Sequence, residues 1–401
     1  MRFVRLLSVL GCILCAAAAF AQTGFTAKKF TLPGGQTRLQ TGDFNHDGRM
    51  DLVVYGGDTA AIVFNLGGGN FSPPVTADSG FLAFNLAVGD FNGDGIPDLA
   101  TCATDAHENA HIRVLLNNGH GKFSVSTDIP VDEQECASMF AGDINHDGKL
   151  DLVSGAITTR FGDRAGHFTS TVTQAVNVNP RNHPSITGCF ASGLIGGHFI
   201  LSTRFDLLVT GVCNNPPGQP TIDFGTIFLA HNQGNGHWTL SEVREQDVTW
   251  QFSGNAIDVN RNGIPDALLV HRFNKIGNAQ VIYGLDYLRD NGSGSFSYFT
   301  VFTRNATTSL NRTFVFSGTS GDFDRDGAPD FAAGYEQSGA FDIALIDDAS
   351  GRFSVSQHFA VPGTIFSMAS ADFNRDGKPD FAAIAINSTN LQGTLLVFLK
   401  K

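Results

Sequence analysis

A nine-residue string, Asp-x-Asn/Asp-x-Asp/Asn-Gly-x-x-Asp, occurs six times in this chain of 401 residues. Every copy has oxygen-bearing side chains at positions 1, 3, 5 and 9 and glycine at position 6. The glycine permits a sharp turn, because it accepts a positive φ. The oxygen-bearing residues are Asp43, Asn45, Asp47 and Asp51; Asp90, Asn92, Asp94 and Asp98; Asp143, Asn145, Asp147 and Asp151; Asp258, Asn260, Asn262 and Asp266; Asp322, Asp324, Asp326 and Asp330; and Asp372, Asn374, Asp376 and Asp380.

These side chains match the ligand preferences of calcium. Calcium is a hard cation that takes ~6–8 oxygen ligands in a flexible shell, whereas magnesium requires a rigid octahedron and keeps its waters. The alternative is an acidic β-turn without metal. However, the six copies place 18 aspartates in six tight clusters, where like charges repel strongly. We therefore predict about six Ca²⁺ sites, one in each string.

The residues on both sides of the strings predict β-strands. Asp98 is followed by Leu-Ala-Thr-Cys-Ala-Thr, and Asp51 is followed by Leu-Val-Val-Tyr. Short apolar runs bounded by Gly, Asp and Asn are typical of strands. The EF-hand differs, because its loop has 12 residues, ends in glutamate and joins two helices. We expect each string to form a loop that joins two strands.

The strings recur about every 50 residues, except that the interval from Asp143 to Asp258 is twice as long. Residues 193–211 fill this interval with a degenerate repeat that keeps only the closing Asp206. A second motif, ending in Gly-x-aromatic, predicts a hairpin turn later in each repeat. Its clearest copies run from Asn65 to Phe71, Asn117 to Phe123, Asn232 to Trp238, Asp290 to Phe296 and Asp347 to Phe353. Seven repeats of four strands predict an all-β, seven-bladed β-propeller.

The two ends of the chain predict how the ring closes. The last repeat stops within residues 395–401, at its third strand. Residues 24–33 have the pattern of a fourth strand and match residues 351–362. We therefore expect the N-terminal strand to complete the last blade, which removes the exposed edges of an open sheet. Residues 22–401 are expected to form a single domain.

The strings and their setting resemble the FG-GAP/VCBS repeats, the family that also builds the propeller head of the integrin α-subunit. The resemblance covers residues 24–401 and is weakest in the fourth and fifth repeats. It implies a seven-bladed propeller with calcium in the loops between the first and second strands, on one face. It does not imply the function of an integrin, because fold and function separate readily.

Residues 1–21 predict a secretory signal peptide, with Arg2 and Arg5, an apolar run and the ending Ala-Phe-Ala21. A lipoprotein box ending at Cys12 is a weaker alternative, because its apolar stretch would be only about six residues. No later apolar run approaches the ~18–20 residues of a membrane helix. The sequence thus predicts export to the periplasm, the cell surface or the medium, without a transmembrane segment.

Four cysteines remain after the predicted signal peptide, and an even number in an exported protein permits two disulfides with three connectivities. They are Cys102, Cys136, Cys189 and Cys213. We favour Cys102–Cys136 and Cys189–Cys213; four buried thiols are the alternative. The second pair would flank the repeat without a metal loop, where a covalent bond could replace the lost calcium.

Two features argue against other classes of function. The formal net charge is −12, whereas nucleic-acid binding needs basic patches. The string His107-Glu-Asn-Ala-His111 matches a zinc-protease motif, but that chemistry requires a helix. Here the string falls between two predicted strands, so we predict no zinc site.

The longest connections fall on the face opposite the metal loops, around the third to fifth blades. They are residues 173–187, 213–224, 242–251 and 271–278. Binding residues favour such loops on a rigid scaffold, although tolerated surface insertions would look the same. The candidate ligand-binding residues are Arg181, His183, Asn214, Arg244, Trp250, His271 and Arg272.

Together these features predict a secreted, monomeric, calcium-binding propeller that acts as a binding or adhesion scaffold for a protein or glycan. Calcium would be structural. The alternative is a polysaccharide-active enzyme, a lyase or hydrolase, on a calcium-rich propeller. An enzyme needs a convergent set of reactive side chains in a concave pocket, and the sequence does not assemble one. The ligand, any catalytic activity, the disulfide connectivity and the occupancy of each loop stay open.

Overall fold

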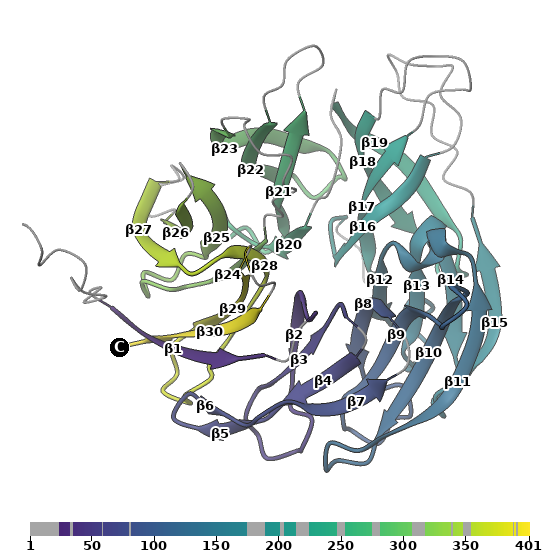
Figure 1. Ribbon diagram of the computed structural model, residues 1–401. Coiled ribbons are helices and arrows are strands. Elements are labelled where there is room, and N and C mark those ends of the chain that lie inside the picture. Colours follow the sequence, from purple (N-terminus) through teal and green to yellow (C-terminus); the bar gives the residue numbers. More distant parts are fainter. Residues whose placement is uncertain are drawn as a thin grey trace, which may run out of the picture.

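A computed structural model gives the structure of the protein (Figure 1). It describes residues 24–32, 35–57, 59–79, 82–174, 189–200, 204–213, 224–246, 253–274, 281–306, 317–337, 340–347, 354–387, 389 and 392–401. For some residues inside strands, the structure describes the backbone but not the side chain. The predicted signal peptide and Cys12 lie outside the described residues.

The unit of the fold is a four-stranded antiparallel sheet. The described chain contains seven such sheets and one two-stranded ribbon, formed by β5 (Asn65–Gly67) and β6 (Asn70–Phe71). All but one of the four-stranded sheets come from a single stretch of chain. The exception combines the N-terminal strand with the last three strands.

The first three sheets follow one another along the chain. The first contains β2 (Arg38–Gly42), β3 (Asp51–Tyr55), β4 (Thr59–Val63) and β7 (Val75–Ser79). The second contains β8 (Leu82–Gly89), β9 (Asp98–Thr104), β10 (Ala110–Asn117) and β11 (Phe123–Val131). The third contains β12 (Met139–Gly142), β13 (Asp151–Ser154), β14 (Thr158–Gly162) and β15 (Phe168–Thr173). Short 3₁₀ helices, η1 (Glu133–Cys136) and η2 (Gly155–Ile157), lie in the connections of this part.

Four more sheets complete the described chain. The fourth contains β16 (Cys189–Gly197), β17 (Asp206–Cys213), β18 (Phe224–Asn232) and β19 (Trp238–Gln246). The fifth contains β20 (Ser253–Ile257), β21 (Asp266–Asn274), β22 (Val281–Asp290) and β23 (Phe296–Ala306). The sixth contains β24 (Gly318–Gly321), β25 (Asp330–Gln337), β26 (Ala340–Asp347) and β27 (Ser354–Val361). The last contains β28 (Thr364–Ala371), β29 (Asp380–Ile386), β30 (Gly393–Lys400) and β1 (Phe25–Thr31).

The predicted pairing of the N-terminal strand with the last strand is confirmed. β1 runs antiparallel to β30, from Phe25 opposite Lys400 to Thr31 opposite Thr394, and Figure 1 shows the two strands side by side. The Phe25 ring packs against the Phe359 ring at 5.6 Å between centroids. The N-terminal strand therefore supplies both ladder hydrogen bonds and core to the last sheet.

The hydrophobic core lies between neighbouring sheets. Val53 of the first sheet shares a buried cluster with Leu99 of the second, whereas its neighbour Leu52 shares one with Ala382 of the last. Alternate residues of a strand point to opposite faces, so the second strand of a sheet packs on two neighbours. Burial on both faces explains why β9 and β29 are buried at every position. The chain is thus an all-β propeller with blades of four strands.

The predicted starts of two connections, residues 242–251 and 271–278, are wrong. β21 continues through His271 and Arg272, which lie opposite Gly284 and Tyr283 of β22. Arg244 lies in β19, opposite Ile227 of β18. These strands continue because β-branched and aromatic residues favour a pleated sheet. The partner strand β22 contains Val281, Ile282 and Tyr283, and the partner strand β18 contains Ile227 and Phe228. Within the described ranges, no helix is long and apolar enough to cross a membrane.

Candidate metal centre

The six acidic strings lie, as predicted, in loops between the first and second strands of six sheets. The position-9 aspartate is the first residue of the second strand in each case, for example Asp51 in β3 and Asp380 in β29. The remaining sheet is the fourth, which has the degenerate repeat. The acidic loops thus occupy equivalent places in six of the seven four-stranded sheets.

The backbone of each loop enters the left-handed region twice. Glycine at position 6 has a φ of +78° at Gly48 and +85° at Gly95, as expected. Position 4 is also left-handed, with a φ of +57° at His46 and +61° at Arg375. The sequence did not predict this second turn, because position 4 is histidine or arginine in five of the six copies. A left-handed non-glycine residue costs on the order of 1–2 kcal/mol, which the hydrogen bonds of the loop offset.

Side chains at positions 1, 3 and 5 hold the loop through backbone hydrogen bonds. In the first loop, Asp43 accepts hydrogen bonds from the N–H groups of Asp47 at 3.0 Å and Gly48 at 2.7 Å. Asn45 Oδ1 accepts a second bond from Asp47 N–H at 3.1 Å. The bonds from the N–H groups of positions 5 and 6 to the position-1 carboxylate recur at Asp90, Asp143, Asp258 and Asp372. An ionised carboxylate has about four acceptor sites, so these oxygens can still ligate a cation.

The position-9 aspartate is buried beneath the loop. Asp51 is 0% exposed and accepts hydrogen bonds from Phe44 N–H at 3.0 Å and Asn65 N–H at 2.7 Å. Burial raises the pKa of Asp51 to about 6, against the opposing effect of these two bonds. Burial likewise raises the pKa of Asp98 and of Asp380 to about 6. A cation near these carboxylates would offset the cost of burying their charge.

The loop Asp322–Asp330 gives the strongest test of whether the residues fit calcium. Ligand oxygens of Asp322, Asp324 and Asp330 lie within 4.8 Å of one another. Asp322 Oδ1 is buried and accepts no hydrogen bond from the described part of the chain. A buried anionic oxygen without a partner is costly, and a set of carboxylates suits a hard divalent cation. The residues of this loop therefore fit calcium.

The corresponding segment of the fourth sheet closes without such ligands. Asp206 is kept at position 9 and accepts two backbone hydrogen bonds, and Phe199 is fully buried at position 2. Position 1 is His198, whose Nδ1 lies 3.0 Å from the carbonyl oxygen of Arg204 at position 7. A direct hydrogen bond thus forms at the position that holds the first predicted ligand in each of the other six loops.

Three asparagines hold the position-9 aspartates in place, and the sequence did not predict this role. Asn65, Asn117 and Asn232 were assigned only to hairpin turns, but their backbone N–H groups bind the position-9 carboxylates of Asp51, Asp98 and Asp206. All three are buried. The recurrence of asparagine four residues before the glycine of the Gly-x-aromatic turn was the signal that could have identified them.

One predicted disulfide is present. Cys102 is bonded to Cys136, with 5.2 Å between the Cα atoms. The backbones of Cys189 and Cys213 lie directly opposite each other in β16 and β17. Their side chains lie outside the description, so the second disulfide stays a prediction.

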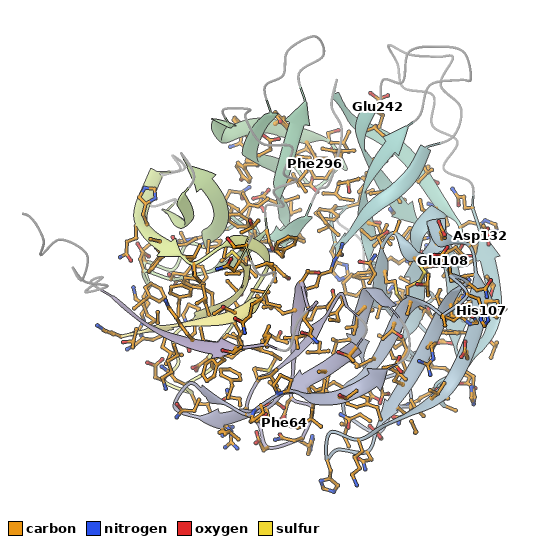
Figure 2. All side chains as sticks on the ribbon, viewed as in Figure 1. Phe64, His107, Glu108, Asp132, Glu242 and Phe296 are labelled. Atoms are coloured by element: carbon orange, nitrogen blue, oxygen red, sulfur yellow. A yellow bond between two sulfur atoms is a disulfide. The ribbon has the colours of Figure 1, made fainter. Side chains whose placement is uncertain are left out.

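The zinc-protease string does not form a helix. His107 lies in a turn, whereas His111 lies in β10. Their nitrogens lie 3.9 Å and 3.8 Å from Asp105 Oδ2. An open hollow of about 550 Å³ adjoins them and is lined chiefly by acidic and polar side chains, among them Glu108 and Asp132 (Figure 2). This hollow lies at the β9–β10 connection, away from the acidic loops.

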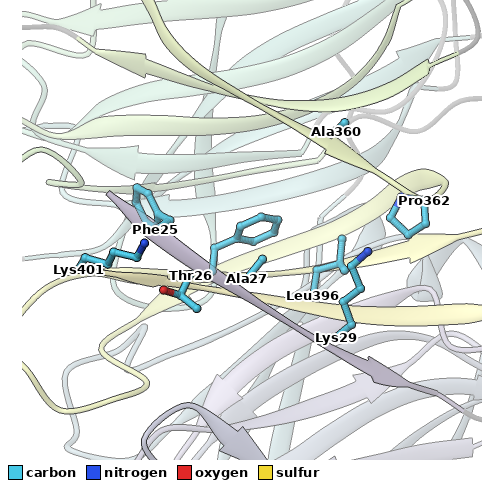
Figure 3. Close-up of a pocket in the computed structure, with 9 residues that line it drawn as sticks. Phe25, Thr26, Ala27, Lys29, Ala360, Pro362, Leu396 and Lys401 are labelled. Carbon is cyan, nitrogen blue, oxygen red and sulfur yellow. The ribbon is translucent and has the colours of Figure 1, made fainter. Parts of the chain in front are cut away.

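A second hollow of about 220 Å³ lies between β1, β27 and β30 (Figure 3). Its lining is mainly apolar and includes Phe25, Leu396 and Pro362, with Lys29 and Lys401 also contributing. This volume is below the ~300–1,000 Å³ that is usual for a small-molecule site.

The predicted ligand-binding residues are only partly described. Arg181, His183, Asn214 and Trp250 lie outside the described residues. The backbones of Arg244, His271 and Arg272 lie in strands, while their side chains are outside the description. The grouping of these seven residues therefore stays a prediction.

Comparisons with known proteins agree with the fold. The model of the FG-GAP-like repeat family matches residues 43–101, 102–154 and 322–383. Among solved structures, the chain is similar to a lectin from Agrocybe aegerita, whose structure concerns specific recognition of non-reducing terminal N-acetylglucosamine. The identity is 17% and the TM-score 0.50, over 82% of this chain and 80% of that one.

The chain is also similar to the WD40 domain of coronin from Toxoplasma gondii, at 10% identity and a TM-score of 0.47, over 94% and 87% of the two chains. A comparison with curated protein sequences gave no match. At such identities a structural likeness concerns the fold alone. The chain therefore contains FG-GAP-like repeats, and its four-stranded sheets have the arrangement of a β-propeller.

Proposed function

We propose that this protein is an exported, calcium-stabilised propeller that serves as a binding scaffold for a glycan or a protein. The observation that carries the calcium assignment is the buried, unpartnered Asp322 Oδ1 beside two further carboxylates. The same residue types recur at positions 1, 3, 5 and 9 of five other loops. Export is supported by the signal-like residues 1–21 and by the Cys102–Cys136 disulfide, since disulfides persist in oxidising compartments.

The role of calcium is structural in this proposal. When bound, the ion would neutralise the aspartates and hold the first and second strands of a blade together. The chain itself supplies the buried position-9 carboxylate, the two left-handed turns and the backbone hydrogen bonds that shape the loop. Metal that binds only the folded state stabilises that state by mass action.

We further infer that the seven sheets form one closed ring. The first strand of each sheet contacts the first strand of the next, and β2 contacts β28 across the two ends of the chain. Ser367 Oγ lies 3.1 Å from Leu39 N and accepts its hydrogen bond at this junction. Gln40 Nε2 donates to the Leu86 carbonyl at 2.6 Å at the next junction. A closed ring covers both faces of every sheet with the neighbouring sheets and gives its loops a rigid support.

Glycan or protein binding fits this architecture better than catalysis does. The similar Agrocybe aegerita structure concerns recognition of a sugar, and loops on a rigid scaffold commonly carry binding residues. We place the ligand on the face opposite the acidic loops, where the long connections between the third and fifth sheets emerge.

Two measurements test the proposal. Scanning calorimetry of the mature chain should show a large fall in melting temperature with EDTA, reversed by excess calcium. A saturated site contributes about 2.7 kcal/mol when free calcium is 100-fold above Kd, so six sites should give an obvious shift. An unchanged melting temperature would refute the calcium assignment. A glycan array and a pull-down, each with calcium present, test the scaffold role; absence of any ligand in both would refute it.

A further inference from the structure

Buried asparagines connect loops of neighbouring sheets at several junctions of the propeller. Asn65 is 0% exposed, and its backbone N–H binds Asp51 in its own loop. Its Nδ2 donates to the carbonyls of Met50 at 3.1 Å and of Phe373 at 2.8 Å. Met50 belongs to the same loop, whereas Phe373 is position 2 of the loop in the last sheet. One side chain therefore holds two acidic loops together.

The same arrangement occurs at the next junction. Asn117 Nδ2 donates to Pro97 O at 3.0 Å within its own loop and to Phe44 O at 2.8 Å in the loop of the first sheet. Its Oδ1 accepts a hydrogen bond from Gly119 N–H. Both amide hydrogens and the carbonyl oxygen are thus satisfied inside the protein, so the side chain is fixed in position.

In the third sheet, a backbone N–H group makes this link in place of an asparagine side chain. Its turn is shorter and has Gly162 at the equivalent place, where the N–H binds Asp151. Gly166 N–H donates instead to Phe91 O, position 2 of the second loop, at 3.1 Å. The linked series therefore contains the loops that begin at Asp372, Asp43, Asp90 and Asp143.

The series ends at the fourth sheet. Asn232 Nδ2 donates to Ile144 O in the third loop at 2.8 Å, but its own loop is the one with His198 in place of the first aspartate. In the fifth sheet the equivalent residue is Asp290, whose backbone N–H binds Asp266 at 2.8 Å. Asp290 Oδ2 is buried and has no hydrogen-bond partner in the described chain. An ionised carboxylate cannot donate, so the link is missing here.

We propose that the four linked loops bind calcium cooperatively, through the buried amides of Asn65 and Asn117 and the backbone of Gly166. This inference rests on the proposed calcium binding. Position 2 lies between the proposed ligands at positions 1 and 3. An ion that orders one loop therefore also orders the position-2 carbonyl, to which the asparagine of the next sheet donates. The same amide residue holds the position-9 ligand of the other loop. Ordering one loop thus reduces the cost of ordering the next, and the effect is reciprocal. Among the described hydrogen bonds, no such link joins the loops at Asp258 and Asp322 to this series.

The test is calcium binding by equilibrium dialysis of the full mature chain over a series of free calcium concentrations. Asn117→Asp removes the donor with little change in size and copies the chain's own Asp290. Asn118→Asp is the control, because it adds the same charge at the exposed neighbouring residue. Asn232→Asp is the second control: it breaks an equivalent buried bond at the end of the series, beside a segment without the acidic ligands.

We expect the Hill slope to exceed 1 for the wild type and for both controls, and to fall for Asn117→Asp. The midpoint for the affected sites should move to roughly fivefold higher calcium or more, the lower end of typical couplings. If Asn117→Asp binds six ions with the same slope as Asn118→Asp, the coupling is refuted and the calcium proposal stands. If the wild type binds no calcium, the proposed function itself fails. If Asn117→Asp does not fold, Asn65→Asp tests the adjacent link, and an unchanged slope there refutes the coupling equally.

Discussion

The loop Asp322–Asp330 and the segment His198–Asp206 occupy the same place in two sheets but close in different ways. The first brings three carboxylates together and leaves a buried oxygen without a hydrogen bond. The second has a histidine at position 1, which bonds directly to a backbone carbonyl. Both keep a fully or nearly fully buried aromatic at position 2, Phe323 or Phe199, and a buried aspartate at position 9.

The difference separates two parts of the repeated string. Positions 2 and 9 are needed for the fold of every sheet, because they fill the core and accept the backbone N–H groups at the start of a blade, and position 9 also faces the proposed metal in the six acidic loops. We propose that positions 1, 3 and 5 serve the metal, because the fourth sheet forms without acidic side chains at these positions. The predictions below test this separation.

The largest effect on the free energy of unfolding should come from Asp206, at position 9 of the segment His198–Asp206. Asp206→Ala removes the acceptor for Ile200 N–H, Asn232 N–H and His231. Each buried donor left without a partner costs about 1–3 kcal/mol, so we expect a loss of roughly 3 kcal/mol or more. Urea unfolding measures this loss. The number of bound calcium ions should stay the same, and a lost ion would contradict the separation.

A smaller, calcium-dependent effect should come from position 1 of the Asp322 loop. Asp322→Asn removes one charge from the set of carboxylates and should lower the unfolding free energy by up to about 2.7 kcal/mol in calcium, the value of one saturated site. In EDTA the variant should match the wild type or exceed it, because a buried charge is removed. Equal destabilisation in both buffers would show that the residue is structural. Asp258→Asn, in the loop with only two carboxylates, should have the smaller effect.

The pH dependence should differ between the metal-free and calcium-loaded protein. The pKa of Asp51, Asp98 and Asp380 is raised to about 6 in the folded, metal-free chain, from an ordinary value of 3.8. Between these values the folded state binds more protons than the unfolded state, so stability should fall as pH rises from about 4 to 6. Calcium holds these groups ionised, so the gain in melting temperature from calcium should grow over the same range. A gain that is constant from pH 4 to 7 would argue against ligation by these aspartates.

The smallest effect should come from position 1 of the fourth sheet. His198→Ala removes one hydrogen bond to the Arg204 carbonyl and a ring contact at 4.3 Å with Phe205. We expect a loss of about 1 kcal/mol, the value of one ordinary hydrogen bond. Because this segment has no acidic side chains at positions 1, 3 and 5, the loss should be equal in calcium and in EDTA. A loss seen only in calcium would place an ion in this segment and remove the contrast with the Asp322 loop.

Much of the fold follows from short-range pattern. Asp43 to Asp51 predicts its own turn, since the glycine and the oxygen-bearing side chains act within nine residues of chain. The match between residues 24–33 and 351–362 predicted the strand that pairs with β30. Strand length was less predictable: His271 and Arg272 looked like loop residues, but pairing with β22 extends β21 through them.

The sequence by itself determined the four-stranded repeat, the acidic loops and the loss of the acidic side chains at positions 1, 3 and 5 of the fourth repeat, because each depends on the chemistry of neighbouring residues. The tertiary structure decided which distant groups meet. Asn117 binds the carbonyl of Phe44, 73 residues away, and Asn65 binds that of Phe373, 308 residues away. An asparagine in a turn has the same sequence pattern whether it faces water or a neighbouring blade. Only the packing of the sheets removes the water and makes its amide the link between two loops.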